Sequence, residues 1–302
     1  MSSHLLIWTA GAATGFLAAV AMLRARRVVS VSTVLALGWA WAGLLIGAKW
    51  QYQLEQFPLP SALWMSPGEV LEPGLRLPLG LLVGGVLAGL WCLAVGAPWR
   101  ATGDALAVAA SAMMPIGRIG CLVNGCCMGA VCGRFAAFCL RYPPGSEAYT
   151  VQLSDDLIPA SAPLSLPAHP LPLYFAASSL VILAVLLWLY RRGAPQGALL
   201  ATFCILEPLV KLLLEPLRAT PRPPALMVGI PLSVLTVSSI VLVAKYRQIV
   251  VAHRSTVAPA ARPAAIALLL LAFVSTSAAA SVVSDASSPR RSGEYRLEGG
   301  RT

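Results

Sequence analysis

The stretch Pro115-Ile-Gly-Arg-Ile-Gly-Cys-Leu-Val-Asn-Gly-Cys-Cys-Met-Gly129 decides how this sequence is interpreted. Arg118 is the only charged residue between Asp104 and Arg134, in a run apolar enough to lie within a bilayer. A charge at that depth costs roughly a few kcal/mol, so it normally faces a polar interior or a ligand. We therefore expect the other helices to form a membrane chamber around Arg118, with glycines allowing close backbone approach.

The composition is that of a polytopic membrane protein. Hydrophobic residues make up 58% of the 302 residues and charged residues 11%, whereas soluble domains carry roughly 25% charged residues. The net charge of +10 does not indicate a nucleic-acid partner. Most basic residues fall in short clusters between apolar spans, where they orient a membrane protein.

Seven apolar stretches reach the roughly twenty residues that cross a bilayer: 5–23, 28–50, 77–99, 103–123, 171–190, 197–217 and 225–244. Basic clusters follow the odd-numbered spans, at Arg24–Arg27, Arg100, Arg191–Arg192 and Lys245–Arg254. Because basic loops stay in the cytoplasm, the amino terminus is predicted outside. The first stretch precedes its arginines, which predicts an anchored helix rather than a cleaved signal peptide. The acidic loop 51–75 and the long, irregular segment 126–170 would then lie outside.

The C-terminal region is expected to differ from the rest of the chain. Residues 264–284 form an eighth apolar run that either crosses the membrane or is a loosely attached helix, and the polar tail after it is predicted to be disordered. The predicted fold is thus an all-α transmembrane bundle of seven spans with a possible eighth. We divide it into a transmembrane domain over 1–250 and a C-terminal apolar segment with a tail over 251–302.

Four charged residues follow one face of the sixth predicted span: Glu207, Lys211, Glu215 and Arg218. Their spacing of four, four and three residues places them on one helical stripe. Facing lipid would be prohibitive, so the stripe must face inward. It is either a salt-bridge ladder that holds helices together or the polar wall of a substrate chamber, in which Glu215 or Glu207 is a candidate partner for Arg118.

Other polar residues in the spans have both plain and functional interpretations. Lys49 and Tyr52 at the outer end of the second span are either a snorkelling lysine with an interfacial aromatic or part of a site. Asp104 opens the fourth span, where it is expected to be an N-cap or first-turn acid. His169, before a proline, is typical of a structural histidine, but it lies on the same predicted side as the end of the Arg118 span.

Five of the seven cysteines lie between positions 121 and 139: Cys121, Cys126, Cys127, Cys132 and Cys139. No Cys-x-x-Cys pair is present, so the spacing gives little support to zinc, and we expect no metal and no cofactor. On the oxidising side of a membrane, one or two disulfides are an alternative. Small apolar fillers at the helix end are another.

The sequence resembles the prolipoprotein diacylglyceryl transferase family over about residues 5–245. Gly117-Arg-Ile-Gly-Cys-Leu-Val-Asn-Gly125 is similar to the family signature Gly-Arg-[Ile/Leu]-Gly-Asn-Phe-[hydrophobic]-Asn-Gly-Glu. Three further motifs agree in order and spacing: Gly43-Leu-Leu-Ile-Gly-Ala-Lys49 through Tyr52, His169-Pro-Leu-Pro-Leu-Tyr174, and Lys211-Leu-Leu-Leu-Glu-Pro-Leu-Arg218. Seven spans with an outer amino end are also that family's topology.

The chain departs from the family pattern at several positions. Cys121 and Cys126 stand where the signature has Asn and Glu, and Lys49 and Lys211 replace arginines, which keeps the charge without the bidentate fork. The third span begins Leu77-Pro-Leu-Gly80, where relatives carry His-Gly-Gly with a proposed catalytic base. The resemblance therefore indicates a divergent, cysteine-rich branch.

The resemblance implies transfer of the diacylglyceryl group of phosphatidylglycerol to a lipobox cysteine thiol of prolipoproteins, in the bacterial cytoplasmic (inner) membrane. Arg118, Lys211, Glu215 and His169 are then the candidate catalytic residues, with Arg118 on the lipid phosphate and His169 or Tyr52 as base. The candidate substrate-binding residues are Lys49, Tyr52, Asn124, Arg218, Gly117 and Gly120. Phosphatidylglycerol, other membrane lipid and the lipobox peptide are the expected partners.

Three other functions fit the same residues. The chain could be a non-catalytic phospholipid-binding protein of this fold, or a related transferase with a different acceptor. A thiol-redox protein using Cys126 and Cys127 ranks last, because adjacent cysteines form a disulfide only with strain.

Overall fold

The computed structural model describes residues 3–56, 77–132, 138–219 and 225–252. Within these ranges the chain is helical, with isolated β-bridges but no extended strand. The helices are α1 (Ser3–Ala25), α2 (Val31–Gln56), α3 (Leu77–Ala94), α4 (Trp99–Asn124), α5 (Glu147–Ser154), α6 (Leu171–Arg191), α7 (Ala198–Leu214) with the 3-10 turn η3 (Glu215–Leu217), and α8 (Ala225–Ala252).

The predicted all-helical membrane bundle is confirmed in its main feature. Five helices among the described residues are long and apolar enough to cross a bilayer: α1, α2, α3, α4 and α6. Helix α7 covers most of the sixth predicted span but has 17 residues, with Pro208 inside it. The count of seven spans and the outer amino terminus remain predictions.

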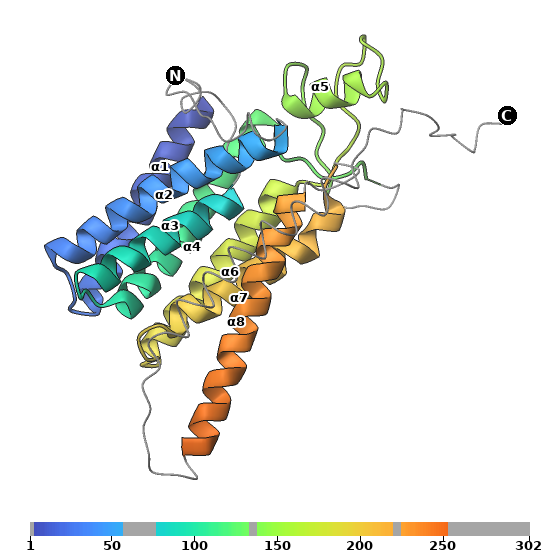
Figure 1. The fold of residues 1–302 in the computed structure, drawn as a ribbon. Coiled ribbons are helices and arrows are strands. Elements are labelled where there is room, and N and C mark those ends of the chain that lie inside the picture. Colours follow the sequence, from blue (N-terminus) through green and yellow to red (C-terminus); the bar gives the residue numbers. More distant parts are fainter. Residues whose placement is uncertain (1–2, 57–76, 133–137, 220–224, 253–302) are drawn as a thin grey trace.

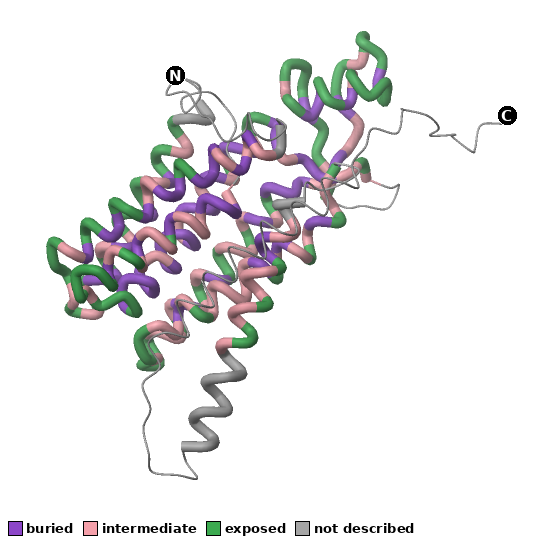
Figure 2. The backbone as a smooth tube through the Cα atoms, in the orientation of Figure 1, coloured by how far each residue is buried: buried purple, intermediate pink, exposed green. Residues whose placement is uncertain are grey.

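Helix α4 is the centre of the bundle. It packs on α1, α6 and α7, while α2 packs mainly on α3 and α8 on α7. Buried residues concentrate along α4, as Figure 2 shows. The central position follows from the small residues of its first four turns, among them Ala101, Ala105 and Ala109, which let neighbouring helices approach closely. The helix that carries Arg118 is therefore covered by other helices over most of its length, and it is exposed on one side near its end, at Ile119 and Val123.

Helices α2 and α3 pack through glycines. A Cβ on Gly47 would lie 2.8 Å from the Leu79 carbonyl oxygen, and one on Gly80 would lie 2.5 Å from the Leu44 carbonyl oxygen. Neither position can hold a side chain without separating the helices. The glycine motif of the second span is thus explained by helix packing.

The segment 126–170 contains a helix that the sequence analysis did not expect. Ser146 caps α5 by accepting a hydrogen bond from the Tyr149 amide at 3.2 Å, and the Tyr149 hydroxyl donates to the Ala162 carbonyl at 2.8 Å. Figure 1 shows α5 beyond one end of the bundle. The prediction of a wholly irregular segment was wrong at 147–154, where the serine before Glu147 is an N-cap signal.

Two sequence predictions concern residues outside the described ranges. Most of the acidic loop, including Glu69 and Glu72, falls in 57–76, and the eighth apolar run falls in 253–302. The proposed division at residue 250 remains a prediction.

Candidate active site

The loop after α4 is held between the start of α6 and the end of α7. The Gly129 amide donates to the His169 carbonyl at 2.9 Å, and the Ala130 amide donates to the Leu217 carbonyl at 2.8 Å. Gly129 and Arg218 also form an isolated antiparallel bridge. These contacts join three segments that are distant in sequence: the loop after α4, the residues before α6 at His169, and the residues after α7 at Arg218.

Arg118 lies against an aromatic ring. Its guanidinium carbon is 4.6 Å from the centroid of the Phe175 ring on α6, a distance at which the ring face attracts the cation. Its Nε atom is buried and donates no hydrogen bond to any residue in the described part of the chain. Buried guanidinium nitrogens are normally hydrogen-bonded, so this atom indicates a place for a ligand acceptor.

Glu215 binds a different arginine from the one suggested by the sequence. The Arg218 Nε atom donates to Glu215 Oε1 at 2.8 Å, and a second guanidinium nitrogen lies 3.4 Å from Oε2. Both side chains are largely buried, at 9% and 6% exposed. Glu215 thus orients Arg218.

Lys211 is the centre of the charge cluster. It is 6% exposed, and the charges of Glu207, Arg118, Arg218 and Glu215 all act on it. The prediction that all four charges follow one helical stripe was wrong for Glu215 and Arg218, because α7 ends at Leu214 and these residues lie in and after the 3-10 turn η3. Charges from α4, α7 and this turn therefore converge on Lys211. Three cations and two carboxylates leave one positive charge in excess, in protein interior of low dielectric, which favours an anionic ligand.

Lys49 and Tyr52 form a second pair on α2. Lys49 is 1% exposed, and its ammonium nitrogen is 5.5 Å from the Tyr52 ring centroid. Lys49 therefore does not snorkel to the surface. The structure supports an interior role for Lys49.

Three cysteines converge beside the charge cluster, which the sequence analysis missed. The sulfur atoms of Cys121, Cys126 and Cys127 all lie within 4.8 Å of one another, and Cys121 and Cys126 are buried. Hydrogen bonds from the other two thiols and the positive charges of Arg118 and Arg218 hold the pKa of Cys127 well below its ordinary value. A Cys-x4-Cys-Cys spacing does not announce such a cluster, because its geometry depends on the turn after α4.

The remaining loop cysteines form a disulfide, one of the alternatives from sequence. Cys132 and Cys139 are joined, and their sulfurs and a ring nitrogen of His169 all lie within 4.8 Å of one another. His169 Nδ1 is also 3.4 Å from the Tyr174 hydroxyl. His169 is thus held between a disulfide and a tyrosine.

Comparison with known proteins matches most of the chain to one family. The family model for prolipoprotein diacylglyceryl transferase matches residues 3–251. The chain belongs to the prolipoprotein diacylglyceryl transferase family. With its several apolar helices, this member of the family is a multi-pass membrane protein.

Two relatives carry the name phosphatidylglycerol–prolipoprotein diacylglyceryl transferase. The protein of Methylibium petroleiphilum is 30% identical over 184 residues, which is 58% of this chain and 62% of the relative. The protein of Rhodopirellula baltica is 30% identical over 122 residues, which is 38% of this chain and 24% of the relative. The chain thus matches less than two thirds of the length of either transferase.

Three more residues of this transferase-family member were predicted to bind substrate: Gly117, Gly120 and Asn124. A Cβ on Gly117 would lie 2.8 Å from the Trp8 ring, so this glycine lets α1 approach α4. Gly120 is buried, and Asn124 is exposed at the end of α4. The three substrate-binding roles remain predictions.

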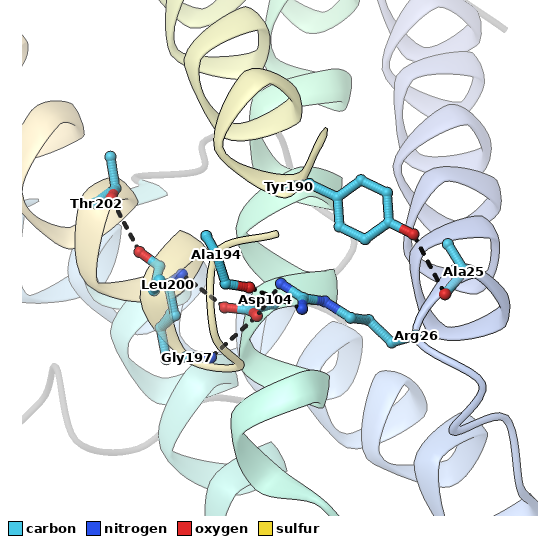
Figure 3. A network of polar contacts seen from close by, with 9 residues as sticks. Ala25, Arg26, Asp104, Tyr190, Ala194, Gly197, Leu200 and Thr202 are labelled. Carbon is cyan, nitrogen blue, oxygen red and sulfur yellow. Dashed lines mark hydrogen bonds and ion pairs between the residues drawn. The ribbon is translucent and has the colours of Figure 1, made fainter. Parts of the chain in front are cut away.

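Asp104 has a different role from the one predicted. Helix α4 begins at Trp99, so Asp104 is neither its cap nor in its first turn. Its carboxylate accepts hydrogen bonds from the Gly197 and Leu200 amides at 3.0 and 3.1 Å, and lies 3.2 Å from an Arg26 nitrogen (Figure 3). Asp104 therefore caps the start of α7 from a neighbouring helix, about 21 Å along α4 from Arg118.

Proposed function

We propose that this chain transfers the diacylglyceryl group of phosphatidylglycerol to a cysteine thiol of a prolipoprotein and releases glycerol phosphate. Membership of the family and the names of two relatives support this reaction. The cluster of Arg118, Lys211 and Arg218 also supports it, because cations can stabilise the phosphate leaving group. Phosphatidylglycerol would enter sideways from the bacterial inner membrane, and the lipobox peptide from the outer side, where the amino terminus is predicted.

The observation that carries the proposal is the buried Arg118 Nε, which has no partner among the described residues. A phosphodiester oxygen would satisfy it with a charge-assisted hydrogen bond. When the glyceryl carbon–oxygen bond breaks, the phosphate gains one negative charge. Donors already in place where charge develops stabilise the transition state more than the ground state.

The neighbouring charges have distinct proposed roles. Lys211 adds a second cation beside Arg118. Arg218, held by Glu215 at 2.8 Å, would contact the departing glycerol phosphate. Lys49 and Tyr52 are proposed to contact the lipid from α2. His169, 3.4 Å from the Tyr174 hydroxyl, is the candidate base for the acceptor thiol.

A transfer assay tests the proposal. The purified protein is given labelled phosphatidylglycerol and a lipobox peptide, and labelled peptide is measured. Because removing one transition-state donor costs about 100- to 1000-fold in rate, Arg118→Gln should lose at least that much. Arg141→Gln, at an exposed position of the segment between α4 and α5, is the matched control. Full activity of Arg118→Gln would overturn the assignment.

A second candidate function is favoured by one observation. Leu77 to Gly80 opens α3 without a histidine, at the place where relatives are expected to carry their base. A phospholipid-binding protein without transferase activity would have the same cation cluster. It would retain labelled lipid in the assay and leave the peptide unlabelled, and a transferase with a different acceptor would label another thiol.

A further inference from the structure

The cluster of three thiols is not used by the reaction as proposed so far. Cys121, Cys126 and Cys127 stand at the end of the helix that carries Arg118, with their sulfurs within 4.8 Å of one another. The charge of Arg118 acts on Cys121 and Cys127, and that of Arg218 acts on Cys127. The thiols therefore lie beside the proposed phosphate site.

The turn after α4 holds these thiols together. Gly125 ends the helix with φ of 69°, and Cys127 also has a positive φ of 57°. A non-glycine residue in this region costs on the order of 1 kcal/mol and persists only where its surroundings enforce it. Here the next residues enforce it, since the Gly129 amide donates to the His169 carbonyl just before α6 and the Ala130 amide donates to the Leu217 carbonyl in η3.

We propose that Cys121, Cys126 and Cys127 bind one zinc ion whose fourth position takes the acceptor thiol. This inference rests on the proposed transferase function. A tetrahedral zinc with bonds of about 2.3 Å to sulfur spaces its ligands about 3.8 Å apart. The three sulfurs, within 4.8 Å of one another, need to close by at most about 1 Å. Three protein ligands and one open position are typical of catalytic zinc sites.

Zinc would activate the acceptor thiol directly, in a chain whose α3 begins without a histidine, and His169 would then assist by accepting the thiol proton on its way to solvent. A thiol that coordinates zinc is deprotonated, so the acceptor binds as thiolate and its proton passes to solvent. The sulfur then forms a bond to the glyceryl carbon of phosphatidylglycerol. The carbon–oxygen bond to phosphate breaks, and its electron pair leaves with glycerol phosphate. No atom changes oxidation state overall, and the thioether product leaves the metal because it is a weak ligand.

The charges around the cluster suit this arrangement. One zinc ion with four thiolates carries a charge of −2, and the phosphodiester is also an anion. Arg118 acts electrostatically on the thiols and is the proposed phosphate ligand, so it attracts both reactants to one place. In protein interior this attraction is stronger than in water.

Metal binding is tested on the full-length protein, purified in detergent without chelator. We expect about one zinc per chain by elemental analysis, and protection of the three thiols from maleimide when zinc is present. Cys127→Ser should weaken zinc affinity by more than about 100-fold, because even outer-shell changes cost about 10- to 100-fold. Cys92→Ala and Cys204→Ala, two free cysteines elsewhere in the bundle, should bind zinc as wild type.

Cobalt substitution tests the fourth position. The cobalt-loaded protein should show sulfur-to-metal charge-transfer absorption that increases with a cysteine lipobox peptide and not with its serine analogue. Absence of zinc binding, or a disulfide within the cluster, overturns the site. Undiminished transfer by metal-free protein overturns the catalytic inference and leaves the proposed function standing. A peptide-dependent spectrum without transfer overturns the proposed function instead.

Discussion

The Arg118 guanidinium lies over the Phe175 ring, 4.6 Å from its centroid, and joins α4 to α6 at the site. A desolvated cation–ring contact is worth about 2 kcal/mol, equivalent to about thirtyfold in an equilibrium constant. We expect Phe175→Leu to lower transfer kcat/KM by about tenfold or more. Phe175→Tyr keeps the ring and should stay close to wild type.

The control for this contact lies on the same helix. Leu173 is 41% exposed, so Leu173→Ala should leave kcat/KM unchanged. Equal activities of Phe175→Leu and wild type, at equal thermal stability, would show that the ring does not position Arg118.

The Glu215–Arg218 pair is expected to act as a unit. Hydrogen bonds to charged groups are worth about 1.5–3 kcal/mol, so Glu215→Gln should lower kcat/KM by about 10- to 100-fold through a misplaced Arg218. The double variant Glu215→Gln/Arg218→Gln should be little worse than Arg218→Gln alone. The cycle is measured with phosphatidylglycerol and lipobox peptide, and Glu147→Gln, at an exposed position of α5, is the matched control.

Additivity in this cycle would contradict the assignment. Two residues that act independently multiply their losses, whereas a positioning residue has no further effect once its partner is gone.

Gly129 is required where three segments meet. A Cβ there would lie 2.6 Å from the His169 Cβ and 2.7 Å from the Leu217 carbonyl oxygen. Gly129→Ala must therefore separate the loop from α6 and α7, and we expect it to reduce both zinc binding and transfer. Both are measured on the same detergent preparation, with thermal unfolding recorded in parallel.

Gly85 provides the comparison for that substitution. It is within α3, and a Cβ there has no heavy atom within 4 Å. Gly85→Ala should raise stability by about 0.5–1 kcal/mol, the usual difference between glycine and alanine in a helix. A Gly129→Ala protein indistinguishable from Gly85→Ala in activity would contradict the role of the loop.

Asp104 is expected to control stability rather than chemistry. It is fully buried and bonded to Arg26 and two α7 amides, and removing one partner of a buried ion pair costs about 3–5 kcal/mol. Asp104→Asn should therefore lower Tm strongly in detergent. Transfer kcat/KM, measured well below Tm, should be unchanged, because the residue is about 21 Å along α4 from Arg118.

Asp155→Asn, in an exposed loop position, is the reference for Asp104→Asn. If both variants unfold at the wild-type temperature, the network in Figure 3 contributes nothing to stability.

The sequence by itself predicted the long apolar helices and the charged residues of the candidate site. Hydropathy and the spacing of Lys211, Glu215 and Arg218 are properties of the chain read in order, so the apolar helices and an inward stripe could be predicted. A lone arginine in an apolar helix predicted a ligand or a partner for the same reason. The family resemblance added the phosphate.

Only the tertiary structure decided which side chains meet. Packing of α6 on α4 brings the Phe175 ring against Arg118. Asp104 caps a helix that begins more than ninety residues later. Three thiols converge because Gly125 and Cys127 have positive φ. Such contacts depend on which helices pack together and on the backbone conformation of single residues, such as the positive φ of Cys127. Neither is contained in local periodicity, and both are enforced by hydrogen bonds between segments far apart in the chain.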